Sequence, residues 1–209
     1  MVLFSLFYLK KLITKNNIDT DIAGYIQSDQ YPPSRKVNLL LGSSSILTLS
    51  SSKGLMCGPW LNRGIGSSHI SDIVQYMNLT ALAIMPAHIV IYAGENDLSE
   101  GKSIKNVFTD YLLLLNVIKK RYPASTVLMV SIKNSPKRQG VWKRFKSLNL
   151  RLKELATKRY NVKFLDISVL LDGNDKKLHY QKDGIHLNKT GMALFTNGIN
   201  SSCEKTTIN

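Results

Sequence analysis

Acidic residues are scarce in this chain of 209 residues, which has 14 Asp and Glu side chains against 28 Lys and Arg. The formal net charge of +14 indicates an anionic neighbour, such as an acidic glycan, a phospholipid or a nucleic acid. The basic residues are not interleaved with aromatic side chains on which bases could stack, so we do not expect nucleic acid as a partner. An anionic substrate or surface remains open.

Cysteine is nearly absent. The two cysteines, Cys57 and Cys203, show no CxxC spacing, so we expect free thiols rather than a disulfide or a thiolate metal site. A chain of this length can bury enough surface in one core to fold without such a crosslink. We therefore expect one domain over residues 1–209, with residues 1–35 as a helical lead-in.

Long apolar runs are also missing. The N-terminal MVLFSLFYLKKLIT is shorter than the roughly 20 apolar residues that cross a bilayer. Its lysines follow the apolar run and no small-residue cleavage site is evident, unlike a signal peptide. We expect a first helix that docks on the domain or makes peripheral membrane contact, in a soluble protein that is cytoplasmic by default.

After the prolines of YPPSR, short apolar runs alternate with amphipathic patterns. Near-continuous apolar runs are typical of strands that are covered on both faces. The runs are residues 37–42, 88–94, 126–132 and 162–167, with a weaker one at 60–64. Helical patterns cover about 69–80, 103–121 and 139–160 and follow Asn188. This alternation predicts an α/β fold, a three-layer α/β/α sandwich around a parallel sheet of about five strands.

Much of the positive charge lies in residues 137–163. Apolar side chains recur there at helical spacing, and basic residues fill the other face: the stripe is Val141, Phe145, Leu148, Leu152 and Leu155. The basic face is either a solvated outer surface or an anion-docking surface.

Three serines follow the first predicted strand, in GSSSI after Leu41. One serine at the end of a strand usually caps the helix that follows, and three exceed that need. At least one is therefore a candidate for chemistry. A serine hydroxyl is a weak nucleophile until a base activates it, so the rest of the chain must supply a histidine, an acid and donors for an oxyanion.

Two other strand ends carry candidate donors. In YAGENDLSEG, Gly94 permits a sharp turn and Asn96 presents an amide that can donate into the same cleft, although a turn asparagine often serves its own backbone. In NRGIGSSHISD, two glycines lie where a strand gives way to a helix, and the turn can direct backbone N–H groups at an anion.

DGIHLNKTG, near the C-terminus, places Asp183 and His186 on one tight turn. The carboxylate can then fix the imidazole tautomer and leave the other ring nitrogen for a serine. The alternatives are a capping aspartate with a surface histidine, or half of a metal site. No third ligand lies at a useful spacing for a metal. The other histidines, His69, His88 and His179, have no acid spaced in this way.

Taken in order, GSSSI, NRGIG, YAGENDLSEG and DGIHLNKTG resemble the four sequence blocks of the SGNH hydrolases, also called GDSL-type esterases. The resemblance covers about residues 20–200. SIKNSPKR and the DQYPP before the first strand are similar to a bacterial subgroup with the GSSSI form. The resemblance implies the flavodoxin-like SGNH hydrolase fold, ester hydrolysis and no cofactor or metal.

Residue by residue, the resemblance makes Ser44 the nucleophile, with Asp183 and His186 as acid and base. Ser43 replaces the aspartate of the family's GDS block. Ser43 and Ser45 would support the turn or cap the next helix.

For the oxyanion hole, the resemblance implies the N–H of Ser44, the Asn96 amide and the N–H of a family glycine. That glycine aligns best with Ser67, and the neighbouring Gly66 is the alternative. Serine can supply the same backbone N–H if its conformation is permitted without glycine.

The function we expect is a serine esterase acting on a small acyl ester of a small molecule or an anionic glycan, such as O-acetyl on a carbohydrate. No lid-like apolar segment is evident that would shelter a fatty chain. The alternatives are a lysophospholipase or thioesterase for longer acyl chains, an O-acyltransferase, and a non-catalytic module on the same fold.

Overall fold

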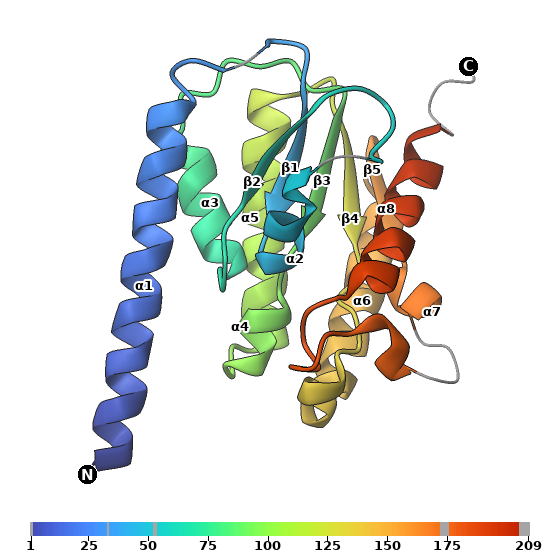
Figure 1. Cartoon of the computed structure of the whole chain (residues 1–209). Coiled ribbons are helices and arrows are strands. Elements are labelled where there is room, and N and C mark those ends of the chain that lie inside the picture. Colours follow the sequence, from blue (N-terminus) through green and yellow to red (C-terminus); the bar gives the residue numbers. More distant parts are fainter. Residues whose placement is uncertain (1, 33, 52–53, 172–175, 205–209) are drawn as a thin grey trace.

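The computed structural model describes residues 2–32, 34–51, 54–171 and 176–204 (Figure 1). Five strands form one parallel sheet in the order β2-β1-β3-β4-β5. They are β1 (Asn38–Gly42), β2 (Trp60–Gly64), β3 (His88–Tyr92), β4 (Thr126–Val130) and β5 (Val162–Leu165). The strand order is that of flavodoxin-like doubly wound sheets. The predicted fold class is confirmed, including the weaker strand at 60–64.

Helices cover both faces of the sheet. They are α1 (Val2–Ser28), α2 (Ser44–Leu47), α3 (Ile70–Leu79), α4 (Glu95–Ser99), α5 (Ile104–Arg121), α6 (Trp142–Thr157), α7 (Ile167–Leu171) and α8 (Lys189–Glu204). Three short 3₁₀ helices, η1 (Thr48–Ser51), η2 (Pro136–Val141) and η3 (Lys176–His179), lie between them. Figure 1 shows α5 and α6 behind the sheet and α2 and α8 in front of it.

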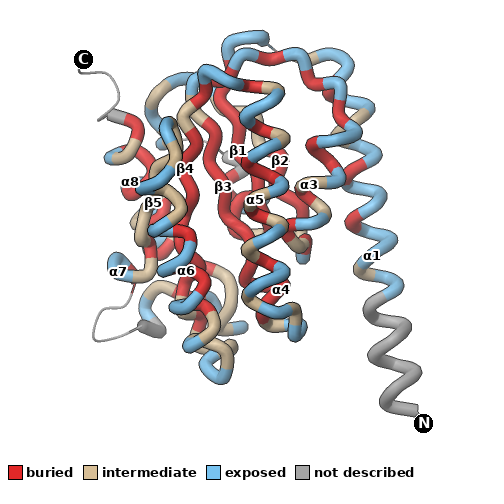
Figure 2. The backbone as a smooth tube through the Cα atoms, turned by 180° about the vertical axis from the view of Figure 1, so that it is seen from behind, coloured by how far each residue is buried: buried red, intermediate tan, exposed pale blue. Residues whose placement is uncertain are grey.

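Alternate side chains of the strands enter two separate apolar clusters. Leu39 and Leu41 of β1 belong to the cluster formed with α3, α5 and α6, whereas Leu40 belongs to the one formed with α2, α7 and α8. All three leucines are fully buried, and Figure 2 shows the inner strands buried along their length. Burial on both faces explains why the strands are continuous apolar runs rather than alternating ones.

The second half of α1 packs against the rest of the domain, which was one of the two arrangements expected for the first helix. Ile18 and Ile22 are buried in the first apolar cluster, and the Tyr25 hydroxyl donates to the carbonyl of Gly64 at the end of β2 (2.7 Å). Within the described ranges, no helix has the length and hydropathy needed to cross a membrane.

The predicted basic helix begins later than expected, at Trp142 rather than near 139, because the preceding residues form η2. The apolar stripe is confirmed: Phe145, Leu148 and Leu152 are buried. Cys57 and Cys203, both within the described part of the chain, are not joined by a disulfide.

Candidate active site

Three of the four blocks lie at the carboxyl ends of strands: α2 follows β1, the loop before α3 follows β2, and α4 follows β3. The segment with η2 follows β4, and the fourth block, with Asp183 and His186, lies between η3 and α8. In Figure 1 these segments share the lower edge of the sheet with the segment that leads into α8. Doubly wound sheets bind ligands at this edge.

Of the three serines after β1, only Ser44 reaches the surface. Ser43 and Ser45 are each 3% exposed, whereas Ser44, the first residue of α2, is half-buried. Ser43 occupies the N-cap position of α2, but its side chain makes no capping hydrogen bond. Ser43 therefore stands at the position expected of a cap, but its hydroxyl does not cap the helix.

The backbone at Gly42 leaves no room for a side chain. A Cβ atom there would overlap the carbonyl oxygen of Tyr92 and the side chain of Ile46. The next residue, Ser43, donates its backbone N–H to the same Tyr92 carbonyl (3.0 Å). The glycine thus lets the turn into α2 pass directly over the end of β3, which brings Ser44 beside the segment that carries Asn96.

Ser67 adopts a left-handed backbone conformation, with φ of +58°. Glycine reaches this region without steric cost, whereas other residues seldom do. Of the two positions that the resemblance offers for the family's glycine, Ser67 has the positive φ and Gly66 does not. The N–H of Ile65 donates to the Gly42 carbonyl (2.8 Å), so this loop lies against the start of the Ser44 turn.

Asn96 does not serve its own turn. It is 8% exposed and lies in α4, which begins after Gly94 in the left-handed conformation. Its Nδ2 donates to the carbonyl of Ser68 (3.1 Å), and its Oδ1 accepts from Nη2 of Arg138 (2.9 Å). The amide therefore connects α4 to the Ser67 loop and to η2.

A buried ionic cluster lies next to Asn96. Glu95, 3% exposed, accepts from the Tyr92 hydroxyl (2.9 Å) and from Ser135 Oγ (2.6 Å), and it forms ion pairs with Lys133 and with Arg138 (3.3 Å). Burial by itself would raise the pKa of Glu95, but the two cations hold it below its ordinary value.

Sequence reasoning did not assign a role to this cluster. Lys133, Ser135 and Arg138 belong to SIKNSPKR, which was noted only as a subgroup resemblance. The signal available was a lysine and an arginine close to the end of a buried strand.

Asp97 fixes the other side of α4. This fully buried carboxylate accepts from the backbone N–H of Ile70 (3.2 Å) and pairs with Lys102 (3.1 Å). Burial raises its pKa despite these partners. The contact with Ile70 ties α4 to the start of α3, directly after the loop that carries Ser67.

Asp183 and His186 meet as predicted. Asp183 Oδ2 lies 2.6 Å from His186 Nδ1, and Asp183 Oδ1 accepts from the backbone N–H groups of Ile185 (2.9 Å) and His186 (3.0 Å). Although burial acts to raise it, the pKa of Asp183 falls to about 2 through the His186 hydrogen bond and these backbone donors. The Gly184 carbonyl accepts from the N–H of Lys137 (3.0 Å), so η2 holds this turn in place.

Ser44 and His186 are both described, and no hydrogen bond joins their side chains in this structure. The structure brings together Asp183 and His186, and separately Asn96 and the Ser67 loop. Ser44 lies at the same edge of the sheet, without a hydrogen bond to His186.

His69 has an acidic partner that is distant in the sequence, since its Nε2 lies 3.1 Å from Glu100 Oε2. The two residues are 31 positions apart and come from the start of α3 and the end of α4, so spacing along the chain could not reveal the pair.

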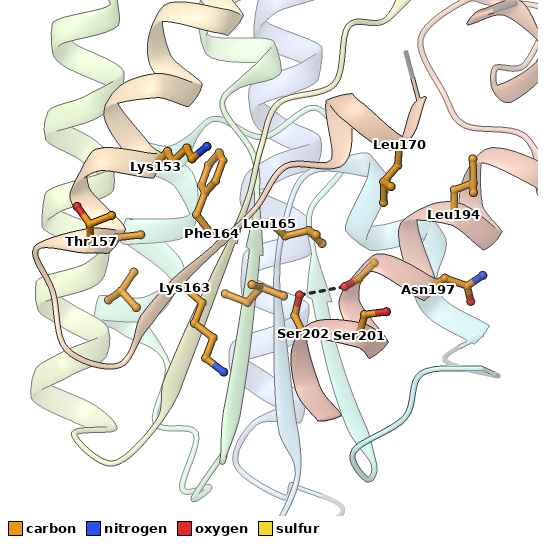
Figure 3. Close-up of a pocket in the computed structure, with 14 residues that line it drawn as sticks. Lys153, Thr157, Lys163, Phe164, Leu165, Leu170, Leu194, Asn197, Ser201 and Ser202 are labelled. Carbon is orange, nitrogen blue, oxygen red and sulfur yellow. Dashed lines mark hydrogen bonds between the residues drawn. The ribbon is translucent and has the colours of Figure 1, made fainter. Parts of the chain in front are cut away.

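Two further features of the described residues concern a possible metal and a cavity. Among the described residues, no group of three or more His, Cys, Asp and Glu side chains is arranged to hold a metal. A cavity of about 820 Å³ lies at the β5 edge between α6 and α8 (Figure 3). Its walls include Lys153, Phe164, Leu170 and Leu194 and none of the predicted site residues.

The fold occurs in known hydrolases. It is similar to a Streptococcus pneumonia protein provisionally named a platelet activating factor, at 17% identity and a TM-score of 0.82, covering 95% of this chain and 98% of that one. A GDSL-like lipase from Bacteroides thetaiotaomicron is 18% identical, with a TM-score of 0.72 over 88% and 98% of the two chains. A carbohydrate esterase family 3 protein from Talaromyces cellulolyticus is 14% identical, with a TM-score of 0.62 over 83% and 98%. At these identities the likeness shows the fold alone.

Comparison of the sequence itself goes further. No curated protein matches the chain. The model of the GDSL-like lipase/acylhydrolase family matches residues 53–194. This range begins after Ser44 and includes Asn96, Asp183 and His186. Since the match extends over more than half of a chain that has the family's fold, this protein belongs to the GDSL-like lipase/acylhydrolase family.

Proposed function

We propose that the protein is a serine esterase that transfers a small acyl group from an ester to water. The observation that carries the proposal is the 2.6 Å contact between Asp183 and His186 Nδ1, at the sheet edge where Ser44 alone of three serines is accessible. No hydrogen bond to His186 Nε2 occurs within the part of the chain that the structure describes, so this nitrogen is available to a serine hydroxyl.

In the proposed reaction, His186 Nε2 takes the proton of the Ser44 hydroxyl as Ser44 attacks the ester carbonyl. Asp183 holds the imidazole in the required tautomer and stabilises its charged form. The N–H groups of Ser44 and Ser67 and the Asn96 amide stabilise the oxyanion. His186 then returns the proton to the departing alcohol, and a water molecule releases the acid by the same steps. The chain's own residues supply each of these groups.

A small acyl group, such as acetyl on a carbohydrate, fits the surroundings of Ser44 best. β1 ends at Gly42 and α2 starts at Ser44, while β3 ends at Tyr92 and α4 starts at Glu95. Such short connections leave little chain to shelter a fatty acyl group. A carbohydrate esterase family 3 protein has the same fold, so the fold is compatible with a carbohydrate ester as substrate. The net charge of +14 favours an anionic substrate such as an acidic glycan, and also keeps a lysophospholipase as the second candidate.

A series of p-nitrophenyl esters from acetyl to palmitoyl tests the acyl preference, and we expect kcat/KM to fall as the chain lengthens. Ser44→Ala should lose nearly all activity, whereas the matched variants Ser43→Ala and Ser45→Ala keep much of it. Labelling of Ser43 or Ser45 by a fluorophosphonate would contradict the assignment of the nucleophile. Capture of the acyl group by an added sugar in preference to water would instead make the protein an acyltransferase.

A further inference from the structure

The side-chain amide of Asn96 is held from both ends by groups of opposite polarity. Its Nδ2 faces the carbonyl oxygen of Ser68 at 3.1 Å, and its Oδ1 faces the guanidinium of Arg138 at 2.9 Å. A flipped amide would place oxygen against oxygen at Ser68 and N–H against N–H at Arg138. Both contacts therefore favour the one orientation in which Nδ2, the proposed oxyanion donor, points away from η2.

Arg138 is itself fixed by a buried carboxylate. Its Nη1 lies 3.3 Å from Oε1 of Glu95, a residue that Ser135 and Lys133 also hold. The Lys133 side chain is 1% exposed and that of Arg138 is 19% exposed. One carboxylate thus balances two cations, and the cluster retains a net positive charge beside Asn96. A planar guanidinium can bond the carboxylate and the amide oxygen at once, which the single ammonium of a lysine does less well.

We propose that Arg138 is a positioning residue for the reaction: with Glu95 as its anchor, it fixes the Asn96 amide so that Nδ2 faces the developing oxyanion. Arg138 acts through Asn96 rather than on the substrate. This inference rests on the proposed function, because it requires Asn96 to be an oxyanion donor. A preorganised donor stabilises the transition state without reorganising during the reaction, so the effect belongs to kcat rather than to KM.

The test is a double-mutant cycle that combines Arg138→Met with Asn96→Ala, measured as kcat and KM on the best p-nitrophenyl ester. Loss of a hydrogen bond from a charged donor predicts a fall in kcat of roughly 10- to 100-fold for Arg138→Met, with KM little changed. Asn96→Ala alone should cost about 10²- to 10³-fold in kcat. In the Asn96→Ala background, Arg138→Met should have no more than about a twofold further effect.

Two readouts separate positioning from general damage. Arg151→Met is the matched control, since Arg151 lies on the exposed face of α6 over the Phe108 ring, and it should leave kcat unchanged. The side-chain amide resonances of Asn96, identified by their loss in Asn96→Ala, should shift or broaden in Arg138→Met and not in Arg151→Met. If Arg138→Met does not fold, Arg138→Lys replaces it, with a smaller loss of kcat and the same dependence on Asn96.

The outcomes distinguish this inference from the proposed function. If Arg138→Met lowers kcat by the same factor in both backgrounds, or raises only KM, Arg138 does not act through Asn96 and the inference is overturned. If Asn96→Ala turns over at the wild-type rate while fluorophosphonate still labels Ser44, the proposed oxyanion role of Asn96 itself fails, whatever Arg138 does.

Discussion

A buried carboxylate at the end of α1 should be essential to the stability of this fold. Asp29 is 1% exposed and accepts from Nε of Arg63 (2.9 Å) and from the hydroxyl of Tyr76 (2.6 Å), with Thr80 as a further donor. Arg63 belongs to the NRGIG segment that leads to Ser67. The carboxylate thus joins the end of α1, strand β2 and the C-terminal end of α3 at one point.

We expect Asp29→Ala to lower the free energy of unfolding by about 4 kcal/mol or more. The Arg63 side chain is only 9% exposed, and a buried charge left without its partner costs about 3–5 kcal/mol. Each buried hydroxyl left unsatisfied costs about a further 1–3 kcal/mol, although these terms overlap and do not add fully. At about 2–4 °C per kcal/mol for a domain of this size, the melting temperature should fall by at least about 8 °C.

Urea unfolding followed by far-UV circular dichroism measures this loss. Asp19→Ala is the control, because Asp19 pairs with Lys15 on the exposed face of the same helix, 2.7 Å away and with 47% of its side chain exposed, and such pairs contribute less than about 1 kcal/mol. Asp29→Ala combined with Arg63→Met should recover part of the loss, since the uncompensated charge is gone. A loss below about 1 kcal/mol in Asp29→Ala would refute the reasoning.

Two further predictions concern the site. Asp183, whose pKa is lowered to about 2, stays ionised through mildly acid pH, so its protonation should not contribute to an acid-side fall of kcat/KM above about pH 3. The stability that Asp183 contributes is present above its unfolded pKa of about 3.8 and is lost as pH falls through about 2. A pH profile with two acid-side protonations above pH 3 would contradict this. Ser67→Gly should keep activity and stability, because the φ of +58° suits glycine. Ser67→Val should lower the free energy of unfolding by about 1–2 kcal/mol and lose most of the turnover. Equal behaviour of the two variants in thermal unfolding and esterase assays would show that this conformation is not required.

The sheet could be predicted from the sequence because its signal is local. Runs such as residues 37–42 are apolar throughout, since both faces are covered, and the helices between them carry clear stripes. The contact between Asp183 and His186 could be predicted for the same reason, because the two residues are only three positions apart in the sequence. The short helices α2 and α4 were not predicted, because helices of four or five residues carry no periodicity.

Contacts between strand ends could not be found in this way. Lys133 and Glu95 are 38 positions apart, and Arg138 and Asn96 are 42 apart. Lys133 comes directly after the apolar run of β4, so the sequence predicts that it is exposed to solvent. In the structure it is only 1% exposed. Only the parallel topology, which brings the ends of β3 and β4 together, places the lysine against a carboxylate.

The residues on either side of Asn96 suggest why charges are buried here at all. Glu95 is bound by Lys133 and Arg138, and Asp97 is bound by Lys102 and the N–H of Ile70. Buried ion pairs contribute little more to stability than well-packed apolar side chains would, because desolvation offsets their attraction. Ion pairs differ from apolar contacts in being directional, because each carboxylate accepts hydrogen bonds only from particular donors at particular angles. The Glu95–Arg138 pair ties α4 to η2, and the hydrogen bond from Ile70 to Asp97 ties α4 to the start of α3, next to the Ser67 loop. We infer that they define where the Asn96 amide stands relative to both loops, a requirement of the proposed oxyanion hole rather than of the fold.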